Sequence, residues 1–168
     1  VLWWPLYIML KLLDKNLNKV YKLSGYVAAF FLILVAVFIL IGVSSRIFGF
    51  YIRGLAEYSG YSMAAASFFA LSYTFIEGGH IRITLFFEKA TDTKKYILEV
   101  WCLLVASLFS FFLAFYFLKM LLISFKFQER SEGADEILIW IPQTSVAIGS
   151  TLFFICIFHH LIKKIIYK

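Results

Sequence analysis

The sequence predicts an all-α integral membrane protein with four transmembrane helices, an N-terminal amphipathic interfacial helix and both termini in the cytoplasm. The first observation behind this prediction is that four long stretches contain no charged residue. They are residues 24–45, 58–76, 100–118 and 137–158. Each has about the 20 residues that an α-helix needs to cross the hydrocarbon core of a bilayer. The second observation is composition, because 62% of the residues are hydrophobic and only 15% are charged, which departs from the balance of a soluble domain.

The uncharged stretches are also apolar on all sides. Residues 30–41, for example, contain only Phe, Leu, Ile, Val and Ala, whereas a helix of a soluble bundle has one apolar stripe and a polar opposite face. Only helices and closed barrels span a membrane, because lipid offers backbone polar groups no hydrogen-bond partner and each group needs one within the protein. So few segments cannot close a barrel. The predicted spans cover about residues 24–45, 56–77, 97–122 and 138–160.

Residues 1–22 differ from the four-helix transmembrane domain predicted over residues 23–168. Leucines recur in this first segment at helical spacing, while lysines and Asp14 occupy the other face. This pattern predicts a helix that lies in the inner interface, with its lysines near anionic headgroups. The first apolar run of the chain is too long and too poorly flanked for a cleaved signal peptide.

The net charge of +6 reflects membrane topology and indicates no affinity for nucleic acid. Eleven of the 16 lysines and arginines lie before the first span, between the second and third, or after the fourth. The positive-inside rule therefore places both termini and the middle loop in the cytoplasm. The third connection is acidic and is expected to face outward. Its acids are Glu129, Glu132, Asp135 and Glu136.

Few charged residues lie near the predicted spans, and all of them fall at span ends. Arg53 and Glu57 are one helical turn apart and could pair at the outer interface. This structural interpretation is preferred to a role of Glu57 in ion coupling. No span combines a helix breaker in its middle with a nearby acid, which is the pattern of a transporter's own substrate site.

The second span is rich in small residues. Ala56, Gly60 and Ala64 repeat every four residues, and such a face allows close approach of another helix in a membrane. The fourth predicted span has Gly149 in its outer half, whereas the third is rich in phenylalanine and is expected to face lipid. Spans two and four are therefore expected to pack on each other or on another protein.

No catalytic, substrate-binding or metal-binding residue is predicted, and no cofactor. Nucleophile constellations, phosphate loops and metal-ligand spacings are missing from the sequence. Cys102 and Cys156 lie inside predicted spans and are interpreted as small apolar residues, because their spacing suggests neither a disulfide nor a metal site.

Three histidines leave one alternative open. His80 lies at the inner end of the second span, and His159 and His160 lie at the inner end of the fourth. Two histidines at equal depth on different helices could ligate a haem. The alternative function is therefore a haem-binding membrane anchor of a quinone-linked oxidoreductase.

The chain from Arg46 to Phe87 resembles the small (DctQ-like) membrane subunit of tripartite ATP-independent periplasmic (TRAP) transporters. Arg46-Ile47-Phe48 closes the first span, Glu57 opens the second, and Gly79-His80-Ile81-Arg82-Ile83 closes the second. Four spans, inward termini, a short middle loop and Ile141-Pro142 at the start of the fourth span agree with the same family. The resemblance covers essentially the whole chain.

The resemblance implies a multi-pass subunit of the bacterial inner membrane, and not an enzyme. Its expected partners are a large TRAP membrane subunit that carries the sodium and substrate sites, a periplasmic binding protein that delivers an organic acid, and membrane lipids. The residues expected to contact the large subunit or lipid are Arg46, Arg53, Glu57, Gly60, Ala64, His80 and Arg82. The acidic outer loop is expected to contact the binding protein electrostatically.

Overall fold

The computed structural model describes residues 3–78 and 92–166, and the side chains of residues 14–78 and 94–166. Four long helices make up this part of the chain, which confirms the predicted all-α class. They are α1 (Trp3–Ile47), α2 (Leu55–Ile76), α4 (Asp92–Phe127) and α5 (Trp140–Ile166). The predicted contacts at His80 and Arg82 lie outside the described residues.

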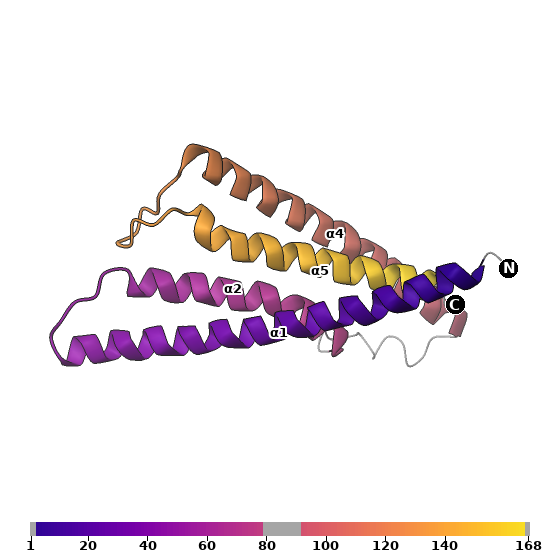
Figure 1. The fold of residues 1–168 in the computed structure, drawn as a ribbon, viewed down its shortest axis with the longest axis horizontal. Helices are drawn as coiled ribbons and strands as arrows, with labels where there is room; N and C mark the ends of the chain where they lie inside the picture. Colours follow the sequence, from indigo (N-terminus) through magenta and orange to yellow (C-terminus); the bar gives the residue numbers. More distant parts are fainter. Residues whose placement is uncertain (1–2, 79–91, 167–168) are drawn as a thin grey trace.

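The helices lie side by side in a single layer, in the order α1, α2, α5, α4 (Figure 1). α2 packs against α1 on one side and against α5 on the other, while α4 packs along α5. α1 and α4 therefore form the two edges of the layer, and α1 meets α5 only near the chain termini. A layer of this kind leaves both of its faces open, so most large apolar side chains of α1 and α4 are exposed.

Three of the four helices are long and apolar enough to cross a membrane. The candidate spans are Asp14–Ile47, Lys94–Phe127 and Trp140–Ile166. α2 has 22 residues, which is enough length, but it is not among these three candidate spans. The chain is therefore a multi-pass membrane protein, while the crossing of α2 and the direction of insertion stay predictions.

α1 is one continuous helix of 45 residues, about 68 Å long at 1.5 Å per residue. The predicted interfacial helix and the predicted first span are thus joined without a break. Gly25, near the junction, does not interrupt the helix but allows a close contact with α2. A Cβ atom at this position would lie 2.6 Å from Cγ of Tyr73, so no larger residue fits there without displacing that ring.

Small residues bring α2 and α5 together, as the sequence predicts for spans two and four. A Cβ atom on Gly149 of α5 would lie 2.8 Å from the carbonyl carbon of Phe68 on α2. Ala65 of α2 and Ala147 of α5 are each only 1% exposed. Close backbone approach of this kind is a main source of packing energy in lipid, where the hydrophobic effect no longer drives helices together.

The small-residue face predicted from Ala56, Gly60 and Ala64 is not the face that packs on α5. Gly60 is exposed, and a Cβ atom there would meet nothing within 4 Å. The buried residues of α2 are Ser62, Ala65, Ala66 and Ser72. α2 therefore carries two small-residue faces, one used within the chain and one open.

Candidate functional site

The α4–α5 loop folds back on itself as a short antiparallel turn. The backbone N–H of Ser131 donates to the carbonyl oxygen of Ile137 at 2.8 Å, and the backbone N–H of Ile139 donates to the carbonyl oxygen of Glu129 at 3.0 Å. The side-chain hydroxyl of Ser124 also donates to the Glu129 carboxylate at 2.7 Å, which ties the loop to the end of α4. The acidic connection is therefore an ordered structure.

This loop docks onto the beginning of α2, and we call the contact the outer junction, after the side of the membrane predicted for it (residues 53–61 against 129–136). Glu57 lies in the first turn of α2, where a carboxylate also interacts favourably with the helix dipole. Its Oε1 accepts a hydrogen bond from the backbone N–H of Ala134 at 3.1 Å. The hydroxyl groups of Tyr61 and Ser131 are 3.0 Å apart and form a second hydrogen bond across the contact.

Two glycines allow the close approach at the outer junction. Gly54 has φ +81°, which favours glycine, and a Cβ atom there would lie 2.9 Å from Cβ of Asp135. A Cβ atom on Gly133 would lie 3.0 Å from an oxygen of Glu57 and 3.0 Å from an oxygen of Asp135. The two carboxylates therefore flank one backbone position, and they concentrate negative charge beside it.

Arg53 pairs with Glu136 across the outer junction, and the predicted pairing of Arg53 with Glu57 is wrong. That prediction assumed that both residues lie on one helix, but α2 begins at Leu55 and Arg53 precedes it. The arginine therefore reaches the loop, and Glu57 is occupied by the backbone of Ala134. Both side chains of the observed pair are more than 60% exposed, so the pair contributes only about 0–1 kcal/mol.

The four acids predicted to dock a binding protein have different surroundings. Glu129 is held by Ser124, and Glu136 is held by Arg53. Asp135 packs its Cβ against Gly54. Only Glu132 is both exposed and without an ion pair or side-chain hydrogen bond within residues 14–78 and 94–166.

The remaining predicted contacts lie on the open surface of the layer. Arg46 is exposed in the last turn of α1, where a cation interacts favourably with the helix dipole. Gly60 is exposed and Ala64 is half-buried on α2. The structure therefore groups Arg53 and Glu57 with the acidic loop, but leaves Arg46, Gly60 and Ala64 apart from it.

A cluster of charges at the other end of the layer was not predicted. Asp14 of α1 lies between two residues of α5, with Oδ1 2.6 Å from Nε2 of His159 and Oδ2 3.0 Å from Nζ of Lys163. Lys164 of α5 pairs with Glu99 of α4. We call these five residues the inner cluster, after the side of the membrane predicted for them, and the cluster links both edge helices of the layer to α5.

Sequence spacing could not have identified the inner cluster, because its pairs join residues as far apart as Asp14 and Lys163. One signal was available. Asp14 is an acid among the lysines of residues 11–22, and Glu99 is an acid inside the apolar pattern of the third span. A lone acid of this kind near a span end is expected to pair with a cation on a neighbouring helix.

The histidines of α5 already have other contacts. His159 contacts Asp14, and its ring centroid lies 6.4 Å from that of Tyr21, which is fully buried. Nδ1 of His160 lies 3.3 Å from the carbonyl oxygen of Cys156, and its ring packs edge-on against Phe75. These two histidines lie next to each other on one helix, so a haem held by two helices would require His80, which lies outside the described residues.

Comparison with known proteins decides the family. The family model described as "Tripartite ATP-independent periplasmic transporters, DctQ component" matches residues 35–166. The chain belongs to this family. Neither the curated proteins nor the solved structures gave a match. The predicted resemblance is thereby confirmed, and this DctQ chain is a transporter component and not an enzyme. The match includes α2, α4, α5 and the outer junction, while the first 34 residues lie outside it.

Proposed function

We propose that this DctQ chain is the small scaffold subunit of a sodium-coupled, binding-protein-dependent TRAP transporter that imports an organic acid. In this proposal the chain braces the large transport subunit in the bacterial inner membrane and helps to dock the periplasmic binding protein. Both termini lie in the cytoplasm, and the outer junction lies in the periplasm.

The observation that carries the proposal is the single layer of helices. A closed bundle would surround its own interior, whereas the described helices lie in one layer and expose many large apolar side chains of α1 and α4. Of the described charged residues, the paired ones gather at the outer junction or in the inner cluster, at the two ends of the layer. Such a layer supplies packing surface for a larger membrane protein, and its described residues form no charged path across the bilayer.

The open small-residue face of α2 is the proposed contact with the large subunit. Gly60 is exposed within this chain, although exposed glycine inside a helix lowers helix stability by about 1 kcal/mol relative to alanine. In a membrane such a residue allows a second helix to approach closely. Arg46, His80 and Arg82 are proposed to contact lipid headgroups or the large subunit at the two membrane surfaces.

The test is co-purification with the large subunit after Gly60→Leu. The leucine would hold a partner helix away, and overpacking of this kind costs about 1–3 kcal/mol, or roughly 5- to 150-fold in affinity. Gly42→Leu in α1 is the matched control, because a Cβ atom at Gly42 also meets nothing within 4 Å. We expect Gly60→Leu to lose the large subunit and Gly42→Leu to retain it. Equal recovery with both variants would refute the proposed contact.

A further inference from the structure

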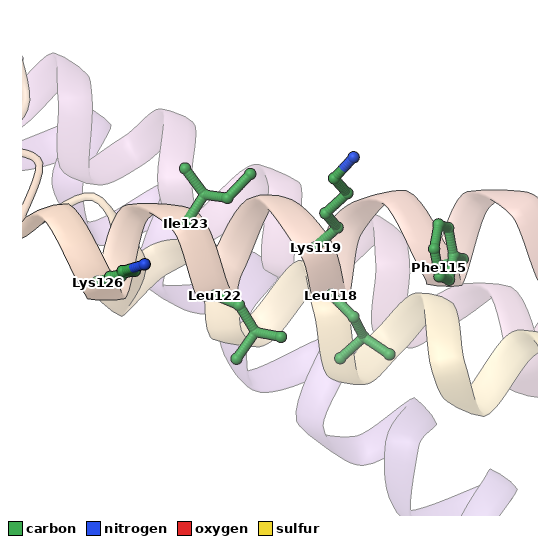
Figure 2. A pocket seen from close by; sticks show the side chains of 6 residues that line it. All are labelled: Phe115, Leu118, Lys119, Leu122, Ile123 and Lys126. Carbon is green, nitrogen blue, oxygen red and sulfur yellow. The ribbon is translucent and has the colours of Figure 1, made fainter.

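A shallow trough runs along the exposed side of α4, towards the α4–α5 loop. It has a volume of about 460 Å³ and is lined by Phe115, Leu118, Lys119, Leu122, Ile123 and Lys126. Figure 2 shows Lys119 and Ile123 pointing to one side of the helix and Leu118 and Leu122 pointing to the other. All six residues belong to this one helix, so the trough is open along its length.

The position of the trough across the membrane follows from the length of α4. Glu99 pairs with Lys164 at the inner cluster, which marks one boundary of the apolar part of α4. Lys119 is 20 residues further along, which corresponds to about 30 Å of helix and to the thickness of a bilayer's hydrocarbon core. Lys119 is therefore placed at the opposite boundary, and Lys126 lies about 10 Å beyond it.

The trough combines positive charge with uncovered apolar surface. Within residues 14–78 and 94–166, neither Lys119 nor Lys126 has a carboxylate at ion-pair distance. Phe115 is 51% exposed and Leu122 is 66% exposed. An anion beside these lysines would compensate their charge next to the hydrocarbon region, where charge is costly.

We propose that the trough binds one anionic diacyl phospholipid from the leaflet on the side of the α4–α5 loop. Lys119 and Lys126 hold the phosphate between them, and an acyl chain lies along Phe115 and Leu118 towards the middle of the bilayer. One lipid molecule supplies both the anion and the apolar cover. A protein partner would have to bring a carboxylate to the same depth, where burial disfavours it. This inference rests on the crossing of α4 and is independent of the proposed transport function.

The experiment is native mass spectrometry of the full chain in mild detergent, titrated with phosphatidylglycerol. Diacylglycerol, which has the chains without the phosphate, and inorganic phosphate, which has no chains, are the comparison ligands. The test variant is Lys119→Ala/Lys126→Ala. The matched control is Lys94→Ala/Lys95→Ala, which removes two exposed lysines from the other end of α4. Lys119→Arg/Lys126→Arg keeps both charges, and circular dichroism verifies the helix content of each variant.

We expect one phosphatidylglycerol to remain bound to the native chain, to the control and to the arginine variant. Charge-assisted hydrogen bonds contribute about 1.5–3 kcal/mol each, so the test variant is expected to bind at least ~10-fold more weakly. Equal retention by test and control variants would overturn the proposal, as would equally tight binding of diacylglycerol. Loss of a co-purified protein from the test variant, with lipid binding unchanged, would assign the trough to a protein and also overturn it.

Discussion

The contact between α2 and α5 allows a matched pair of substitutions. Gly149→Ala and Gly60→Ala add the same methyl group to a glycine within a helix, and each gains about 1 kcal/mol in intrinsic helix propensity. At Gly60 the methyl group enters open space, whereas at Gly149 it lies 2.8 Å from the backbone carbonyl carbon of Phe68. Backbone atoms cannot move aside as the end of a flexible side chain can, so α2 and α5 must separate, at a cost of about 1–3 kcal/mol for overpacking.

Unfolding of each variant in mixed micelles, at increasing fractions of sodium dodecyl sulfate, measures the difference. Gly60→Ala is expected to raise the free energy of unfolding by up to ~1 kcal/mol. The free energy of unfolding of Gly149→Ala is expected to be about 1–3 kcal/mol lower than that of Gly60→Ala, because both variants gain the same helix propensity. Equal free energies of unfolding would refute the reasoning, since close backbone contact at Gly149 would then contribute nothing to the layer.

Two further predictions concern the two ends of the layer. Asp14→Asn removes the carboxylate from the inner cluster and leaves its histidine and lysine partners unpaired. The free energy of local opening should fall by about 1–2 kcal/mol, so the backbone amides of residues 14–20 should exchange hydrogen ~5- to 30-fold faster. The exposed control Glu77→Gln should not change this exchange, and equal exchange in the two variants would contradict the prediction. Glu132→Lys should weaken docking of the binding protein by about 1 kcal/mol and lower uptake at limiting binding protein by roughly fivefold. Glu77→Lys should leave uptake unchanged. Equal uptake by the two variants would count against a docking role of Glu132.

Much of the fold was predictable because its signals are local. A stretch of about 20 residues without charge identifies a membrane helix wherever its partners lie. The outer junction was predictable only in part. Arg53, Glu57 and the acidic loop were each singled out from the sequence, but the pairing between them was wrong. Helical spacing suggested a contact between Arg53 and Glu57, and the true partners, Glu136 and the backbone of Ala134, come from a loop about 80 residues away.

The inner cluster and the continuity of α1 were not predicted. A polar segment followed by an apolar one suggests two helices with different environments, but nothing in residues 20–26 forces a break. Gly25, a residue with high conformational freedom, lies inside the continuous α1 and packs closely against Tyr73 of α2. Likewise, Asp14 acquires its role only because the beginning of α1 crosses the end of α5 (Figure 1).

The sequence by itself determined the helical class, the membrane environment and the TRAP family, since these depend on residue type along the chain. Only the tertiary structure decided that the helices pack in the order α1, α2, α5, α4, that α2 uses Ala65 and leaves Gly60 open, and that Asp14 joins α5. The physical reason is that small residues permit close contact without selecting a partner. Which face of α2 meets α5 depends on the fit of Gly149 against one particular backbone, and this fit exists only when both helices are in place.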